Sequence, residues 1–479
     1  MADKLRISLD QEKTDSNQGS EKAALSRDHV RTTVTGASAK ALILKVLGQL
    51  LFTGYTIFLA RVLAQDDYGV VMYTIALLTF IGPMCLLGYD RAVLKFAVIY
   101  WVQRDYPLLI GLLRRARFVG LGCCGVLSAV ALGVVSSGVL KSLTGVEEAI
   151  LLALLVLPFW TWVTLNISFQ RGLKRVVTAL TGFYIIRPVL AIVFTAAAYY
   201  YWRLTPAAVL VLLTCSLVIV MLIEAYQIRK ALGLQAHGLR PRYEAEKWND
   251  VARPLLLSSI LSTVMNRADL LLVGLLLDMK AAAVYAVASR LAFIPSLVLD
   301  AVRIVISPLI SQYYNEKDFR ALQGHLTEAS QCIFLGTAPV VVPLLLFPQF
   351  FLGWFGDSYT SGATVLILLA LGQLINALAG TVQPLLGMTN HQRAMVKITV
   401  ITAIFYLLLS FPLIDRFGIE GAAAATALTM AVRNIWMVLY IKRRLNIITY
   451  MKLNSIKWRD IIPTELYGGL KRLRHMNPK

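Results

Sequence analysis

The sequence is poor in charged residues and poorer still in acidic ones. Only 15% of the 479 residues are charged, 57% are hydrophobic, and the mean hydropathy is +0.66. A soluble domain carries about 25% charged residues and about 45–50% apolar ones. This shortage of charge excludes an ordinary soluble protein and predicts an integral membrane protein.

The sequence also lacks the patterns of an enzyme or a metalloprotein. It contains no P-loop, no metal-ligand spacing and no catalytic triad spacing, and its five cysteines all fall inside apolar runs. Such cysteines are interpreted as small buried hydrophobic residues. No signal peptide is expected, and residues 1–40 are predicted to be a disordered cytoplasmic tail. We therefore expect no enzymatic activity, no cofactor, no metal and no nucleic-acid partner.

Long apolar runs recur along the rest of the chain. A transmembrane helix needs about 20 mostly apolar residues. By that template the predicted spans are 41–62, 68–88, 116–139, 149–169, 182–202, 206–226, 254–277, 281–309, 330–354, 362–386, 394–414 and 419–441. The predicted fold is an all-α integral membrane protein with about twelve transmembrane helices.

Basic residues outnumber acidic ones by 47 to 27, and their positions test these spans. With twelve spans, 37 of the Lys and Arg residues lie on the side of the N-terminus, five on the opposite side and five inside spans. The positive-inside rule then places both termini in the cytoplasm. The connections on the other side are all short, which argues against a polymerase or ligase of surface polysaccharides.

The hydrophilic segment 227–253 divides the chain into six helices plus six. The predicted organisation is a first lobe at 41–226, a cytoplasmic linker at 227–253, a second lobe at 254–443 and a basic cytoplasmic tail at 444–479. Residues 68–91 and 281–303 are weakly similar, since both carry Phe-Ile shortly before a proline and both end in an Asp/Arg pair. Two repeats of equal orientation predict a binding site at their interface near the membrane midplane.

Three segments resemble polysaccharide-type flippases of the MOP superfamily, which are Wzx-like relatives of the lipid II flippase and of MATE drug exporters. Residues 58–96 (FLARVLAQDDYGVVMYTIALLTFIGPMCLLGYDRAVLKF) resemble the first helix pair, 267–314 (beginning RADLLLVGLLLDMKAAAVYAVASR) resemble helices 7 and 8, and 385–395 (LLGMTNHQRAM) resemble the connection between helices 10 and 11. The resemblance covers roughly residues 40–443. It implies two six-helix lobes in a V shape that alternate between inward-open and outward-open states.

The resemblance also implies a cargo and a location. The implied cargo is an undecaprenyl-diphosphate-linked oligosaccharide, moved across the bacterial inner membrane for O-antigen, capsule or exopolysaccharide assembly. The expected partners are this lipid-linked substrate, membrane lipids, and the polysaccharide polymerase and export machinery.

Four basic residues lie near span ends and are counted with the adjacent loops: Arg61, Arg117, Arg187 and Lys397. Five other basic residues lie inside the predicted spans: Lys45, Arg267, Arg290, Arg303 and Arg433. A charge near the bilayer centre costs at least about 2.5–3.5 kcal/mol, so each should face protein or a watery cavity. Lys45 is close enough to a helix end to snorkel. Arg303 has Asp300 three residues before it as an ion-pair partner.

Arg267, Arg290 and Arg433 are the main candidates for a cationic cavity that binds a diphosphate, since none has an acid at pairing distance along its helix. The guanidinium group stays protonated and matches phosphate oxygens in shape. Lys45, Arg303 and Arg91 complete the candidate set, Arg91 because Asp90-Arg91 ends the second helix of the resemblance. Arg61 and Arg187 are interpreted as interfacial anchors at helix ends.

Polar and aromatic residues supply the candidate sugar contacts. Gln373, Asn376, Gly380 and Gln383 share one face of span 362–386, where they either bond to neighbouring helices or line a wet cavity. Asn166 and Trp160 are further candidates, although tryptophans also form interfacial belts. Asp269 and Asp300 are candidates for coupling to an ion or proton.

Three alternatives remain. A MATE-type multidrug or cation antiporter would favour acids inside the membrane, whereas span 41–62 has none, and span 394–414 lacks the acid of a sodium site shared among helices 7, 11 and 12. A membrane glycosyltransferase or polymerase would need catalytic motifs. A scaffold of a polysaccharide assembly complex without transport also stays open.

Overall fold

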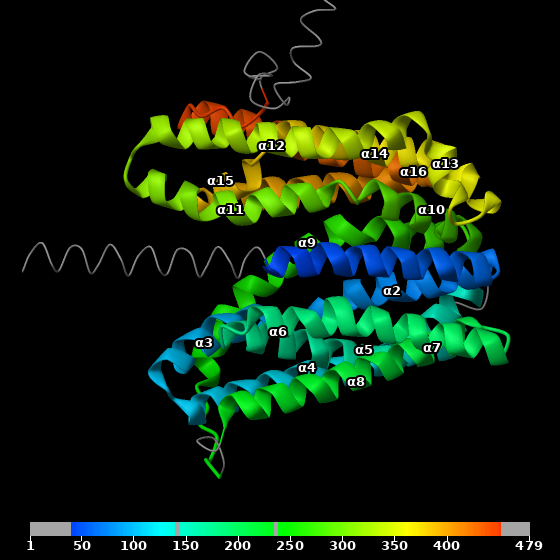
Figure 1. The fold of residues 1–479 in the computed structure, drawn as a ribbon, viewed down its shortest axis with the longest axis horizontal. Helices are drawn as coiled ribbons and strands as arrows, with labels where there is room; N and C mark the ends of the chain where they lie inside the picture. Colours follow the sequence, from blue (N-terminus) through cyan, green and yellow to red (C-terminus); the bar gives the residue numbers. More distant parts are fainter. Residues whose placement is uncertain (1–39, 139–143, 234–237, 452–479) are drawn as a thin grey trace, which may run out of the picture. The chain divides into compact units, whose positions relative to one another are not determined.

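The computed structural model describes residues 40–138, 144–233 and 238–451. Within these residues the chain is helical and contains no strand, which confirms the all-α prediction (Figure 1). The predicted tail at 1–40 lies outside the described residues except for Lys40. The predicted tail at 444–479 lies outside them from residue 452 onward.

Ten helical segments are long and apolar enough to cross a membrane, and the bent pair within α9 makes an eleventh. These are Lys40–Val62, α2 (Gln65–Cys85), α4 (Tyr106–Ser136), α5 (Thr144–Gly172), Val176–Tyr201, α8 (Pro206–Leu232), α9 (Ala245–Leu276), α11 (Ser296–Asn315), α12 (Phe319–Leu346), Asp357–Ala379 and α16 (Gln392–Leu445).

The long helix α16 accounts for the remaining predicted span. Its 54 residues would extend about 80 Å, well beyond a hydrocarbon core of about 30 Å. Gly418 interrupts it with φ 57° and ψ −132°, a conformation that only glycine adopts easily. The two parts on either side of Gly418 match the spans predicted at 394–414 and 419–441, so the expectation of about twelve spans agrees with the helices.

Two predicted spans differ from the helices because the helices break where the spans continued. Span 281–309 is two helices, α10 (Met279–Ala292) and α11, separated by a turn at 293–295. Helix α2 ends at Cys85, and α3 (Tyr89–Gln103) begins after Gly88, which has a φ of 80°. Asp90 and Arg91 therefore lie in the first turn of α3. The sequence had suggested that they end the preceding span, and this prediction is wrong.

The helices pack into two compact units. The first contains the chain up to Arg290 together with 349–365 and 410–422, and the second contains the rest. In the first unit α5 packs against α2, α3, α4 and α8, and α9 packs against α2 and α3 (Figure 1). In the second unit α11 packs against α12 and α15 (Val382–Met388). The six-plus-six division at 227–253 stays a prediction.

The span Val176–Tyr201 changes its helical geometry in the middle. It consists of α6 (Val176–Thr181), a π-helix η1 (Gly182–Ile186) and α7 (Arg187–Tyr201). The Arg187 backbone N–H donates to the Gly182 carbonyl, five residues earlier. A π-helical turn inserts an additional residue into a helix and is frequent at functional sites.

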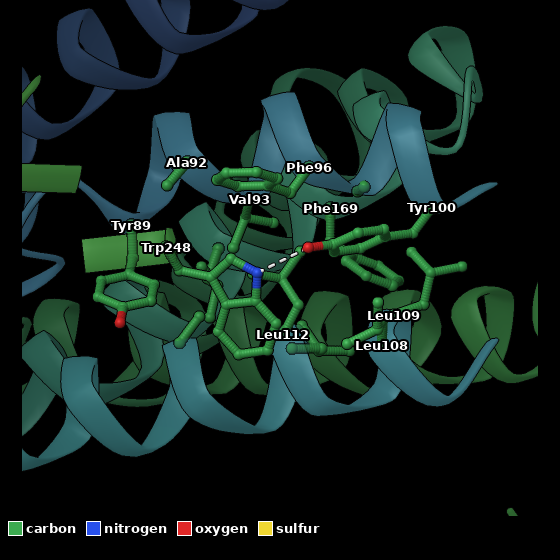
Figure 2. Packing of buried hydrophobic residues seen from close by; sticks show 14 of the residues in the cluster. Tyr89, Ala92, Val93, Phe96, Tyr100, Leu108, Leu109, Leu112, Phe169 and Trp248 are labelled. Atoms are coloured by element: carbon green, nitrogen blue, oxygen red, sulfur yellow. Dashed lines mark hydrogen bonds between the residues drawn. The ribbon is translucent and has the colours of Figure 1, made fainter. Parts of the chain in front are cut away.

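The connection after α8 is fixed to the first unit from residue 242 onward. The Trp248 side chain is fully buried among residues of α3, α4 and α5, and its indole N–H donates to the Tyr100 hydroxyl at 3.0 Å (Figure 2). The Tyr100 hydroxyl in turn donates to Glu244 Oε2 at 2.9 Å. The hydroxyl of Tyr89 donates to Asn249 Oδ1 at 2.6 Å.

Charges around this cluster support the same contact. Arg242 pairs with Asp105 at 3.0 Å, and Lys247 pairs with Glu244 at 3.1 Å. The hydrogen bonds from Lys247 and from Tyr100 hold the pKa of Glu244 below its ordinary value, so its carboxylate stays charged into the acidic range. The part of the predicted linker that follows residue 242 is therefore a structured element of the first unit.

The Tyr100 hydroxyl should contribute measurably to the stability of this contact. Tyr100→Phe removes the acceptor of the buried Trp248 N–H and a donor to Glu244, and should cost about 1–3 kcal/mol. Thermal unfolding of the purified protein in detergent would measure the loss. Tyr106→Phe is the matched control, since the Tyr106 hydroxyl makes no hydrogen bond with the described residues. Equal melting temperatures for the two variants would contradict the prediction.

The residues that follow α16 pass between helices of the second unit. The Gln323 amide group donates to the Ile448 carbonyl and accepts from the Ile448 N–H, both at 2.8 Å. The Ser330 hydroxyl donates to the Thr449 carbonyl at 2.6 Å, and the Met451 N–H donates to the Leu378 carbonyl at 3.2 Å. Residues 446–451 thus connect α12 with the end of α14 (Ala363–Ala379).

Gly380 lies where this segment crosses the break between α14 and α15. Its φ is 72°, and a Cβ atom here would collide with the Thr449 carbonyl and the Ser330 hydroxyl. The predicted face of Gln373, Asn376, Gly380 and Gln383 on one helix is therefore wrong at its end, because the helix stops before Gly380 and Gln383 belongs to α15. Sequence spacing did not reveal the break.

Gly380→Ala should destabilise the second unit by about 1–3 kcal/mol, since it adds backbone strain to the collision with residues 330 and 449. Gly387→Ala, in α15, is the control, because a Cβ atom there meets nothing within 4 Å. Melting temperatures in detergent would separate the two. A loss at Gly387 equal to that at Gly380 would show that the crossing segment is not the cause.

Candidate functional site

Three arginines gather inside the membrane-spanning part of the first unit. Arg187 lies eleven residues into the span Val176–Tyr201, Arg267 follows the 57° bend in α9, and Arg290 lies in the last turn of α10. The charge of Arg290 interacts with those of both Arg187 and Arg267. Sequence analysis selected Arg267 and Arg290, and the structure adds Arg187 to them.

Aromatic rings support two of these side chains. The guanidinium carbon of Arg290 lies 4.2 Å from the centre of the Phe52 ring, and that of Arg187 lies 5.5 Å from the same ring. Arg187 also lies 3.9 Å from the Phe183 ring and 5.2 Å from the Trp160 ring. Cation–π contacts of this kind are worth about 2 kcal/mol or more when desolvated. They stabilise the cations and leave their charge in place.

The nearest acid does not neutralise this group. Asp269 is 8% exposed and interacts with Arg267, but no ion pair within 4.0 Å joins the two in the described part of the chain. Asp269 instead accepts a hydrogen bond from the Tyr285 hydroxyl at 3.0 Å and one from the Leu270 N–H at 2.8 Å. The three arginines therefore carry a surplus of positive charge.

Some of the guanidinium donors are unused. Arg290 Nε and one of its terminal nitrogens are buried and have no hydrogen-bond partner among the described residues. Arg267 is exposed, Arg290 is half-buried and Arg187 is 9% exposed. A buried donor left without an acceptor costs about 1–3 kcal/mol. An anion with several oxygens would accept from these donors and balance the charge.

The second unit has its own pair of embedded arginines. Arg303 lies 3.5 Å from Asp300, the local ion pair expected from their spacing, and its charge interacts with that of Arg433. Both Nε atoms are buried without a hydrogen-bond partner among the described residues. Asp300 is exposed, so it offsets only part of this charge.

The amides of α14 bond across to a neighbouring helix. Asn434 of α16 donates to Asn376 at 3.2 Å, and Asn376 donates to Gln373 at 3.5 Å. All three are buried. Of the two alternatives left by the sequence, the structure shows hydrogen bonding between helices for Asn376, while Gln373 bonds to Asn376 within α14.

Trp160 and Asn166 were also predicted as site residues, and each has its own contacts. Trp160 packs against Arg187 and against Phe183, so its ring stabilises the cation. Asn166 is fully buried and accepts from Arg117 at 2.9 Å, which places it inside the packing of α4, α5 and α8. Lys45, Arg91 and Gln383 are half-buried.

Arg187 is the residue that sequence reasoning misplaced. The span was predicted to begin at 182, which put Arg187 near a helix end, whereas the helical run begins at Val176. The same error affects Arg117, because α4 begins at Tyr106 and the predicted span began at 116. In both cases apolar residues continue on the N-terminal side of the predicted start. Hydropathy alone therefore indicated an earlier start.

The space beside Arg187 is too small for a sugar. A cavity lined by Phe52, Trp160, Arg187, Leu210, Leu213 and Leu217, among others, has a volume of about 20 Å³. That volume holds about one water molecule. The described residues also contain no group of three or more His, Cys, Asp or Glu side chains that could hold a metal ion.

Comparisons with known proteins agree with this architecture. The MatE family model matches residues 254–414. This match covers about a third of the chain. An inward-facing multidrug resistance MATE family transporter of the MOP superfamily has the same fold, with a TM-score of 0.71 and 14% identity over 85% of this chain and 98% of that one.

Two curated proteins are similar in sequence to this chain. A probable low-salt glycan biosynthesis flippase, Agl15 of Haloferax volcanii, is 27% identical over 46% of this chain and 47% of its own length, so the match spans about half of that relative. A putative O-antigen transporter of Shigella flexneri is 24% identical over 76% of this chain and 87% of its own length.

The arginines predict that this protein binds multivalent anions. Inorganic pyrophosphate should raise the thermal unfolding midpoint of the purified protein. Phe52→Leu removes the ring that contacts Arg187 and Arg290, and should weaken pyrophosphate binding by about tenfold, the equivalent of ~1.4 kcal/mol. The control is Phe58→Leu, because the Phe58 ring packs on Tyr199 and contacts no arginine. Equal pyrophosphate affinities in the two variants would count against the assignment.

Proposed function

We propose that the protein is a flippase that moves lipid-diphosphate-linked oligosaccharides across a bacterial inner membrane by alternating access. The observation that carries the proposal is the group formed by Arg187, Arg267 and Arg290. It combines surplus positive charge with unused donors inside the span region. The names of the two curated relatives, a glycan biosynthesis flippase and an O-antigen transporter, support this cargo class.

The chemistry of the cargo matches these side chains. A diphosphate group that leaves the interfacial water must exchange its hydration for other donors, because lipid tails offer none. Arginine supplies a permanent charge and paired N–H groups that match phosphate oxygens. Arg303 and Arg433 provide a further positive group in the second unit.

The membrane potential favours export of such a cargo. With the inside negative, outward movement of an anion gains about 2.3 kcal/mol per charge per 100 mV. Return of the empty cationic site moves positive charge inward, which the same potential also favours.

A MATE-type exporter of cations is the competing function, and the solved structure with the same fold supports it equally. Asp269 is a buried acid of the first unit that such a function would use. The three arginines disfavour it, since they repel a cationic drug at the same place. Transport of an oligosaccharide for capsule, O-antigen or exopolysaccharide, together with a polymerase and export machinery, is the biological setting that we propose.

Arg267→Ala, Arg290→Ala and Arg433→Ala should each reduce translocation by at least about tenfold, since each removes charge-assisted hydrogen bonds to the headgroup. In cells, lipid-linked repeat units should accumulate on the cytoplasmic leaflet while the protein remains inserted. Quantification of surface polysaccharide and of the lipid-linked pool would measure both effects.

Lys280→Ala is the control for these variants. Lys280 is an exposed cation that forms a surface pair with Asp66 at 3.7 Å, and its loss should leave export unchanged. Normal export by all three arginine variants would refute the role of the cationic group. Efflux of a cationic dye that survives in them would favour the exporter function.

A further inference from the structure

A second buried polar group lies in the first unit, and none of its members belongs to the three arginines. It consists of Glu224 on α8, Asn166 and Gln170 on α5, and Arg117 on α4. Glu224 is 0% exposed, Asn166 is 0% exposed and Gln170 is 1% exposed. A carboxyl group at this depth requires an explanation, because burial of an unpaired charge is costly.

Few contacts stabilise the charged form of the Glu224 carboxyl group. Neither of its oxygens makes a hydrogen bond within 3.5 Å with the described residues, and its electrostatic contacts are with the Asn166 side chain and Arg117. A Cβ atom at Gly182, the first residue of η1, would lie 3.4 Å from Glu224 Oε1. Glycine at this position therefore preserves the space beside the carboxyl group.

Arg117 is close to Glu224 but has other partners. Its Nη2 donates to Asn166 Oδ1 at 2.9 Å, and its guanidinium carbon lies 4.4 Å from the centre of the Trp162 ring. It forms no ion pair within 4.0 Å of Glu224, although the two charges interact. A charged carboxylate would draw the guanidinium group into a salt bridge, since the attraction between unit charges is strong at low dielectric. The observed arrangement suits a neutral carboxyl group.

We propose that Glu224 binds and releases a proton inside the bundle, and that Arg117 replaces the proton as the partner of the carboxylate after its release. In the release step the O–H bond of the carboxyl breaks, its electron pair stays on the oxygen, and the proton passes to water. Arg117 then moves from Asn166 to Glu224. The net charge of the Glu224–Arg117 pair changes, while the pair stays at the same place in the bundle.

The surroundings favour a proton over a metal cation. Besides Glu224, the polar neighbours are the neutral amides of Asn166 and Gln170 on α5 and the positive Arg117 on α4, and Arg229 of α8 adds its charge to that of Arg117. Helix η1 contributes Gly182. No ionisable group of α2 or α7 interacts with Glu224 in the described residues. A metal cation would meet the Arg117 charge and too few oxygens.

The exchange links protonation to helix position. Arg117, Asn166 and Glu224 belong to three different helices, so transfer of Arg117 from α5 to α8 changes how α4 holds its neighbours. Such a switch makes the contacts among α4, α5 and α8 depend on protonation of Glu224. It does not depend on which cargo the protein carries.

Carbodiimide labelling tests the proposal without a transport assay. Dicyclohexylcarbodiimide modifies protonated carboxyl groups in apolar surroundings. Mass spectrometry of the full-length protein in detergent should show modification at Glu224 at pH 6, and the modified fraction should fall as the pH rises. The exposed Glu148 serves as an internal control that stays unmodified.

Arg117→Gln tests the exchange itself. Without its replacement partner the carboxylate is less stable, so labelling of Glu224 should persist to a pH higher by about 1–3 units. A Glu224 that remains unmodified from pH 5 to pH 8 would overturn the proton site and indicate a permanent ion pair. An unchanged labelling profile in Arg117→Gln would overturn the exchange. Both outcomes are independent of whether Arg290→Ala still translocates cargo.

Discussion

The cost of positive charge in hydrocarbon is the constraint around which the membrane-spanning helices are arranged. Arginine cannot lower that cost by losing its proton, so its surroundings must change instead. In the first unit those surroundings are aromatic rings. The Phe52 ring contacts Arg187 and Arg290, and the Phe183 and Trp160 rings contact Arg187. Rings hold a guanidinium group without cancelling its charge, which leaves that charge available to a ligand.

The two units meet the same constraint with different means. The second unit places Asp300 beside Arg303 and connects Asn434, Asn376 and Gln373 in a buried chain of amides. The first unit places rings against Arg187 and Arg290, and Asp269 is turned toward Tyr285. The first unit therefore holds the stronger uncompensated charge, and the anion-binding assignment rests on it.

Sequence patterns predicted the fold class and most spans, because hydropathy alone decides which segments can enter a bilayer. They predicted Arg267 and Arg290 as embedded for the same reason. They misplaced Arg187 and Arg117, since a template of fixed length cuts a long span at an arbitrary residue. They missed the break at Gly380, because the backbone of residue 449 that occupies the space there comes from another part of the chain. The neighbours of Glu224 come from three helices that are far apart in the sequence, so no short spacing of residues predicts this group.

The π-helical turn before Arg187 has a consequence for how the chain can vary. Each residue of an α-helix rotates the next side chain by about 100°, and η1 holds one residue more than an α-helical turn would. The direction of the Arg187 guanidinium therefore depends on the number of residues between Val176 and Arg187 as much as on the presence of arginine. Loss of a single residue there would leave hydropathy and charge almost unaltered. It would nevertheless turn the cation away from its three rings, so residue count at this point is itself a determinant of the site.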